Sequence, residues 1–147
     1  PDPVAVVRSV AERVRPGGVL AFHESTWAPL LPLVANLPLT STCVSLMQET
    51  FHRSGARTDM GLRLCATFRD AGLPAPKLRL ELPIGDEPEF TLWIYELWST
   101  LLPQIAARDL ASIGDPGTLV DRLQAELAAA RAFGVFVGMV GAWSRRS

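Results

Sequence analysis

Two segments of this chain are apolar at nearly every position, and they constrain its fold more than any other feature. They are Val19–His23 and Gly134–Trp143. A strand with one wet face alternates apolar and polar residues, so an uninterrupted apolar run predicts a strand covered on both faces. A third segment, Lys77–Leu82, alternates strictly and predicts a strand with one face in water. The two apolar runs therefore need neighbouring strands or helices beyond those that a sheet of three strands supplies.

Segments with helical periodicity separate these strands. Asp2 and Thr58 are expected to act as N-caps, and the spacing of Thr118 to Asp121 approximates a capping box. Pro103 is expected to kink or split the third helical region. The predicted helices cover a segment from Pro3 to the Pro16 turn, Ser45–Arg53, Thr58–Ala71, Glu89–Asp109 and a segment starting at Thr118. This alternation predicts an α/β fold in which helices pack on a sheet.

Composition excludes several classes of protein. The 147 residues carry 14 basic and 15 acidic side chains, a formal net charge of −1, which argues against a nucleic-acid surface. The longest uncharged stretch, Ser25–Gln48, holds three prolines and many hydroxyl residues, so it does not predict a membrane span. We expect it to form a loop with short helices over a pocket or a partner surface. Two cysteines, two histidines and no C-x-x-C spacing predict neither a disulfide framework nor a metal site. With no secretory signal visible, we expect a cytoplasmic protein.

Three landmarks, in order along the chain, resemble the second half of class I S-adenosylmethionine-dependent methyltransferases. Val14–Gly18 is similar to the family's (L/V)-(R/K)-P-G-G turn, which leads into the fifth strand of the sheet. Asp59–Leu73 is similar to the next helix, whose A-G-L ending precedes the sixth strand. Gly141–Arg145 is similar to the antiparallel last strand of the small-molecule type. The resemblance implies the C-terminal part of a Rossmann-like methyltransferase sheet, with helical insertions that form a cap.

One departure from the family concerns the cofactor. None of the eleven glycines lies in a G-x-G-x-x-G pattern, and the acidic residue that ends the family's second strand is absent. The resemblance therefore implies that residues 1–147 are a partial domain, whose first four strands would precede Pro1. S-adenosylmethionine is the implied cofactor of the complete domain, its binding residues remain unassigned, and the isolated chain is expected to be inactive.

The resemblance also implies where an acceptor would bind. Ligands of open α/β sheets lie beyond the carboxyl ends of the strands, and segments 25–57 and 86–117 follow such ends as candidate substrate-cap insertions. The residues it places on the acceptor side are Glu24, Trp27, Met47, Phe51 and Trp93. The plainer alternative for Glu24 is a strand end in solvent, and for Trp27 and Trp93 it is ordinary core packing. For Met47 and Phe51 it is a solvated helix face. His23 is a candidate general base, although alternation also lets it point into the sheet packing.

The function implied by the resemblance is methyl transfer to an O, N or C atom of a small-molecule acceptor by direct displacement. In such a reaction the cofactor carries the activation, so no catalytic triad or metal cluster is expected. The alternative is a non-catalytic α/β binding or dimerisation module whose apolar faces pair in a homodimer. Neither function requires a nucleic-acid or membrane partner.

Overall fold

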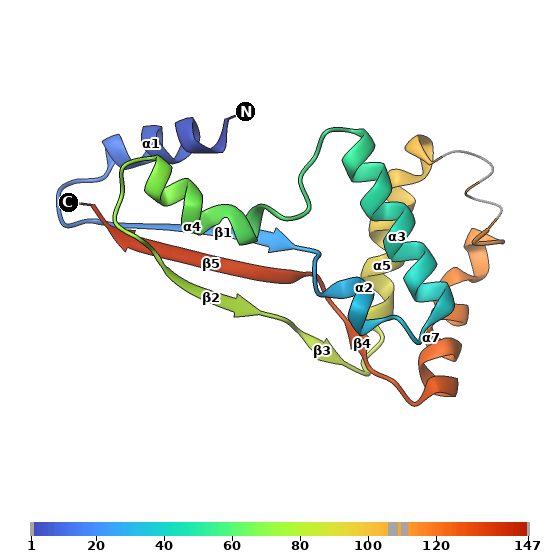
Figure 1. The fold of residues 1–147 in the computed structure, drawn as a ribbon. Helices are drawn as coiled ribbons and strands as arrows, with labels where there is room; N and C mark the ends of the chain where they lie inside the picture. The colour runs from blue at the N-terminus through green and yellow to red at the C-terminus, as the bar shows by residue number, and fades with distance from the viewer. Residues whose placement is uncertain (1, 106–108, 110–111, 147) are drawn as a thin grey trace. The chain divides into compact units, whose positions relative to one another are not determined.

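The computed structural model describes residues 2–105, 109 and 112–146, which form a mixed helix-and-sheet fold (Figure 1). The chain divides into two compact units. The first, called the sheet unit, comprises Pro1–Thr26, Asp59–Glu81 and Gly138–Ser147. The second, called the helical unit, comprises Trp27–Thr58 and Leu82–Val137.

Three strands make up the sheet of the sheet unit: β1 (Val19–Thr26), β2 (Lys77–Glu81) and β5 (Gly138–Arg145). Their order is β1-β5-β2, and β5 runs antiparallel to both neighbours (Figure 1). The register aligns Ala21, Trp143 and Lys77 across the three strands. Because β1 and β2 both oppose β5, they run parallel to each other on either side of it.

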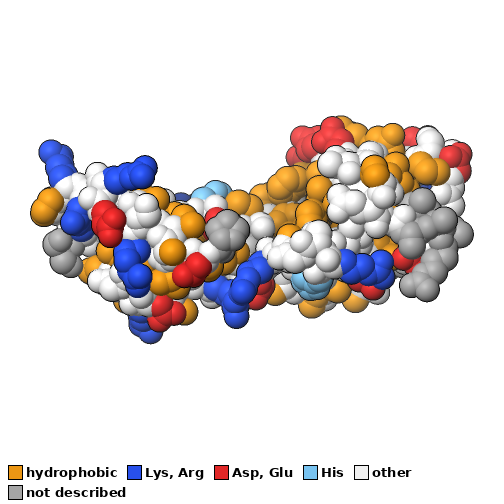
Figure 2. Space-filling model, turned by 90° about the horizontal axis from the view of Figure 1, so that it is seen from above, with side chains coloured by type: hydrophobic (Ala, Val, Ile, Leu, Met, Phe, Trp, Pro, Cys, Tyr) orange, Lys and Arg blue, Asp and Glu red, His pale blue; other side chains and the backbone are white. Residues whose placement is uncertain are grey.

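Helices α1 (Pro3–Arg13) and α4 (Met60–Asp70) lie on the same side of this sheet (Figure 1), the side from which Figure 2 is viewed. The buried cluster beneath them consists of Ala11, Leu20, Leu64, Phe68, Val140 and Ala142. The expected cap of α1 is confirmed, since the Asp2 carboxylate accepts a bond from the amide of Val4 at 3.0 Å. The expected cap of α4 is wrong: Asp59 occupies the N-cap position, and the Thr58 hydroxyl bonds to His52 Nε2.

The opposite face of the sheet, called the uncovered face, is bare in the described part of the chain. Val19, Ala21 and His23 are exposed on it, and Met139 and Trp143 are only half-buried. The prediction of two-sided cover for both apolar runs is therefore wrong, because both helices pack on the Leu20 side. The last run is also not one strand: β4 (Gly134–Val135) ends before β5 begins.

Strand β2 departs from its prediction as well, since every residue of it is exposed. Leu78 and Leu80 align with Ala142 and Val140 of β5 and so share the helix-covered face, yet they are 50% and 55% exposed. The covering helices pack mainly on β1 and β5 and leave the β2 margin in water. Alternation correctly predicted a strand here, but not its exposure.

The Pro16–Gly18 turn is held in place by the other end of the chain. The amide of Gly17 donates to the Arg146 carbonyl at 2.9 Å, and the amide of Arg146 donates to the Gly18 carbonyl at 2.8 Å. Gly17 has a φ of +76°, which a glycine adopts without strain. The Arg146 guanidinium donates to the carbonyls of Glu12 and Val14 at the end of α1. The turn thus joins α1, β1 and β5 at one end of the sheet.

The helical unit contains a small ladder of β3 (Ile84–Gly85) with β4, and several helices packed together. Its helices are α2 (Leu30–Leu33), α3 (Pro38–Arg53), α5 (Glu89–Leu101) and α7 (Leu119–Ala130), with 3-10 turns at Leu102–Gln104 and Pro116–Thr118. The break expected at Pro103 is confirmed. Part of the predicted continuation to Asp109, residues 106–108, lies outside the described residues.

Two sequence expectations in the helical unit need correction. The predicted helix Ser45–Arg53 begins seven residues earlier, at Pro38, so much of the stretch expected to form a loop with short helices is one long helix. Proline at a first helical position is favourable because its missing N–H would have no helical partner. Thr118 occupies the N-cap position of α7, but its hydroxyl donates back to the Asp115 carbonyl and makes no capping box.

Gly61 permits close approach of α4 to the sheet, and this predicts a stability effect. A Cβ atom at this position would lie 2.8 Å from the Glu24 carbonyl oxygen and 2.9 Å from Val140 Cγ2. We expect Gly61→Ala to lower the free energy of unfolding by about 1–3 kcal/mol in urea titrations, because the helix must move off the strand. Gly117→Ala is the matched control, since its Cβ would make only ordinary contacts, the nearest at 3.4 Å. Equal effects of the two substitutions would contradict this account.

Candidate functional site

Three of the residues predicted to bind an acceptor meet in the helical unit. The ring centroids of Trp27 and Phe51 are 5.5 Å apart, and those of Trp27 and Trp93 are 6.2 Å apart. Phe136, which the sequence did not single out, extends the group, with its ring 5.2 Å from that of Trp93. We call these four residues the aromatic cluster. Met47 lies one helical turn before Phe51 on α3 and is fully buried.

The aromatic cluster belongs to a packed interior. Trp27 and Trp93 are 5% and 8% exposed, and Trp93 Nε1 donates to the Val135 carbonyl at 3.0 Å. Phe136 is the most exposed of the four, at 39%. This burial favours the alternative in which Trp27 and Trp93 are core residues. Their contact with an acceptor stays a prediction.

His23 and Glu24 do not converge on one site. They are successive residues of β1, so their side chains point to opposite faces of the sheet. His23 is exposed on the uncovered face, beside Gly141 of β5. Glu24 is half-buried on the helix-covered face, near the carboxyl end of β1. A proton relay between the two side chains is therefore not available.

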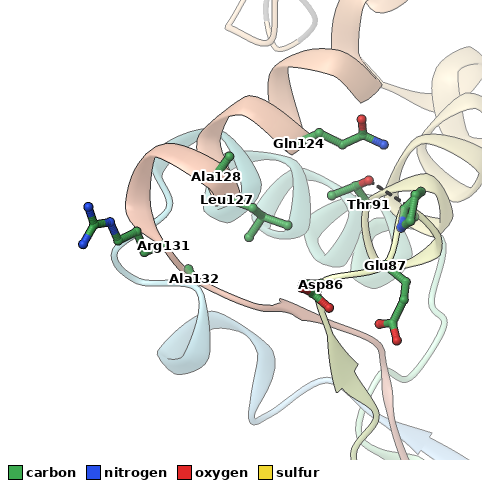
Figure 3. A pocket seen from close by; sticks show the side chains of 9 residues that line it. Asp86, Glu87, Thr91, Gln124, Leu127, Ala128, Arg131 and Ala132 are labelled. Atoms are coloured by element: carbon green, nitrogen blue, oxygen red, sulfur yellow. Dashed lines mark hydrogen bonds between the residues drawn. The ribbon is translucent and has the colours of Figure 1, made fainter.

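The helical unit also contains a hollow of about 510 Å³, called here the α5–α7 hollow. It is lined by Asp86, Glu87, Pro88, Thr91, Gln124, Leu127, Ala128, Arg131 and Ala132. Figure 3 shows Gln124 and Leu127 of α7 extending toward Thr91 of α5, with Asp86 beside them. This volume lies in the range of small-molecule pockets.

The polar groups of the α5–α7 hollow differ in their hydrogen-bond partners, their exposure and the direction in which they point. Thr91 is buried and its hydroxyl donates to the Pro88 carbonyl at 2.9 Å, which leaves the hydroxyl oxygen able to accept. Asp86 and Glu87 are exposed carboxylates at the rim. Arg131, whose φ of 50° ends α7, extends away from the other lining residues (Figure 3). Sequence reasoning missed these residues; the only signal was the acidic run at 86–89.

A second hollow, of about 550 Å³, lies in the sheet unit where β1 and β2 begin and β5 ends. It is lined by Val19, Pro74, Ala75, Lys77, Trp143, Ser144 and Arg145. Open α/β sheets bind ligands at the carboxyl ends of their parallel strands, whereas this hollow lies at the amino ends. It is therefore in the wrong place for a cofactor or acceptor site of that kind.

Glu126 of α7 holds the first turn of α3. Its carboxylate accepts bonds from the amides of Leu39 and Thr40 at 2.6 and 2.9 Å, and from the Thr40 hydroxyl at 2.7 Å. Leu37, at the N-cap position of α3, has no side chain that can cap. The carboxylate thus replaces the missing cap from another helix, and it lies favourably at the positive end of the helix dipole.

No known protein family matches this chain, and no curated protein is significantly similar to it. Among the residues that the structure describes, no helix is long and apolar enough to cross a membrane. The same residues contain no cluster of three or more side chains suited to hold a metal ion.

Removal of the Glu126 carboxylate should weaken the helical unit. We expect Glu126→Ala to lower the free energy of unfolding by about 1–3 kcal/mol, since it leaves two helix amides and a buried hydroxyl without their acceptor. Glu126→Gln retains one carbonyl oxygen and should cost less. Glu96→Ala, at an exposed position of α5, is the control and should change stability by less than about 0.5 kcal/mol. The free energies of unfolding are compared by urea denaturation followed by circular dichroism. A loss of stability in Glu126→Ala no larger than that of the control would refute the role of Glu126 as the acceptor for the first turn of α3.

The two cysteines should differ sharply in reactivity. Burial raises the pKa of the Cys43 thiol to about 12, an effect that the nearby Arg122 only partly opposes, so at pH 8 this cysteine stays a protonated thiol. Cys65 is half-buried. We expect iodoacetamide at pH 8 to label one cysteine in the folded protein and two in urea, as measured by intact mass. The Cys65→Ser variant should stay unlabelled when folded, and rapid labelling of Cys43 would contradict its burial.

Proposed function

We propose that this chain is the C-terminal part of a class I S-adenosylmethionine-dependent methyltransferase that acts on a small molecule. The observation that carries the proposal is the strand order β1-β5-β2, in which the last strand runs antiparallel to both others. The resemblance identified these segments as the fifth strand, the sixth strand and the antiparallel last strand of the family. The observed pairing is consistent with all three assignments.

The composition of the helical unit supports a cap. The sequence suggested insertions at 25–57 and 86–117, and the unit comprises Trp27–Thr58 and Leu82–Val137. Both segments leave the sheet unit where β1 and β2 end. In open α/β sheets these carboxyl ends are where ligands bind. The segments of the helical unit are therefore inserted in the sequence where the resemblance implies a substrate cap.

The residues present do not by themselves fit the cofactor. The glycines with positive φ are Gly17, Gly55, Gly72 and Gly114. The first three follow helices and the last precedes a 3-10 turn, so none forms a loop directly after a strand, where such a cofactor cradle is needed. The edge of β1 opposite β5 has no partner strand among the described residues. We propose that the cofactor-binding strands pair along this edge.

Bound S-adenosylmethionine supplies an activated methyl group, so the contribution of this chain is to position the acceptor. Glu24, half-buried near the carboxyl end of β1, is the residue we assign to orient an acceptor hydroxyl or amine. Exclusion of water is assigned to the helical unit, whose interior includes Trp27 and Trp93. His23 is exposed on the other face of the sheet, which disfavours it as the general base.

Calorimetry tests this proposal. We expect no tight binding of S-adenosylmethionine to the 147-residue chain, because it lacks the cofactor loop. The protein encoded by the whole reading frame should bind the cofactor and transfer its methyl group, with kcat/KM reduced by about tenfold or more in Glu24→Gln. Glu12→Gln, which changes an exposed carboxylate on α1, is the matched control. Absence of cofactor binding by the full protein would overturn the proposal.

The dimerisation module remains a second candidate, and one observation favours it. The free edge of β1 and the uncovered face would let a second copy pair strand to strand. Size-exclusion chromatography with light scattering distinguishes the two functions. A stable, well-folded dimer of the chain favours the module, whereas a monomer that aggregates through this edge favours methyl transfer.

A further inference from the structure

We propose that the α5–α7 hollow binds a small organic cation, an amine or quaternary ammonium group attached to an apolar body. This assignment goes beyond methyl transfer and does not depend on it, because the hollow lies wholly within the helical unit. Three features carry it: the size and apolar floor of the hollow, the excess of negative charge at its rim, and a single cationic side chain in the lining, Arg131, that points away from the hollow.

The floor of the hollow suits an apolar body. Leu127, Ala128 and Ala132 provide aliphatic surface from the last turn of α7 and the residues after it. Pro88 adds a ring from the start of α5. A volume of about 510 Å³ accommodates a molecule with a single aromatic or short aliphatic group.

The charges at the rim favour a cation. Asp86 and Glu87 line the hollow, and Glu89 follows in the first turn of α5. The carbonyl end of α7 and the amide end of α5 both line the hollow, so their opposite helix dipoles offset and the side-chain carboxylates decide the charge preference. Asp86 and Glu87 are the acidic side chains of the lining, so we assign their carboxylates as the partners of the ligand's positive charge.

An anion would find little to bind there. The amides of Phe90 and Thr91 in the first turn of α5 already donate to the carbonyls of Glu87 and Pro88, at 3.0 and 3.1 Å. Arg131 is the only cationic side chain in the lining, and it extends away from the hollow (Figure 3). The buried Thr91 hydroxyl, which donates to the Pro88 carbonyl, offers an acceptor to an ammonium N–H.

Three probes that share a phenyl group test the assignment on the intact chain: 2-phenylethylammonium, 2-phenylethanol and 3-phenylpropanoate. Saturation-transfer NMR titrations measure their affinities and need no methyl donor, so failure here is distinct from failure of the proposed function. We expect the cation to bind more tightly than the neutral alcohol, and the alcohol more tightly than the anion. Equal affinities for cation and anion, or no saturable binding of the cation, would overturn the proposal.

Variants then locate the site. The double variant Asp86→Asn, Glu87→Gln should weaken binding of the cation by about tenfold and leave the alcohol unchanged. Glu89→Gln removes one negative charge from the same acidic run, outside the lining, and should have little effect. Ala128→Trp, at an exposed helical position that lines the hollow, should abolish binding of all probes while circular dichroism stays native. Equal losses in Glu89→Gln and the double variant would refute the assignment of the hollow.

Discussion

The pairing of β5 with both β1 and β2 is the interaction on which the sheet unit depends. These three strands come from the beginning, middle and end of the chain, and neither β1 nor β2 pairs with the other. Since isolated strands have no hydrogen-bond partners for their backbone, β5 satisfies one edge of each. The same strand continues into Arg146, whose bonds to Gly17 and Gly18 fix the turn before β1. Helices α1 and α4 can then cover one shared face.

The helical unit depends on contacts between helices distant in sequence. Glu126 of α7 supplies the cap of α3, and α5 packs on both α3 and α7. The aromatic cluster links α3 and α5 to the segments beside them through Trp27 and Phe136. The α5–α7 hollow is a consequence of this arrangement, because its lining comes from the start of α5 and the end of α7. The proposed ligand class follows from the acidic residues 86 and 87 and the apolar surface of α7, which meet only in the folded unit.

The secondary structure was largely predictable, and the candidate site was not. The alternating pattern of Lys77–Leu82 correctly predicted a strand, and Pro103 correctly predicted the end of a helix, because both act through local backbone geometry. Trp27, Phe51 and Trp93 do meet, as their apolar character suggested, but in an interior rather than in an open site. Nothing local connects Asp86 with Leu127, since they are about forty residues apart and belong to no motif.

The sequence by itself determined the periodicity of each element, the tight turn at Pro16–Gly18 and the cap at Asp2, because these depend on residues within one or two turns of each other. Only the tertiary structure decided which face of β1 is covered, since alternation separates two faces without saying what packs on either. It also decided that α3 begins at Pro38 with Glu126 as its acceptor, a bond that spans 86 residues to Thr40. Such long-range hydrogen-bond partners are determined by the packing of the helices, and no local sequence pattern predicts them.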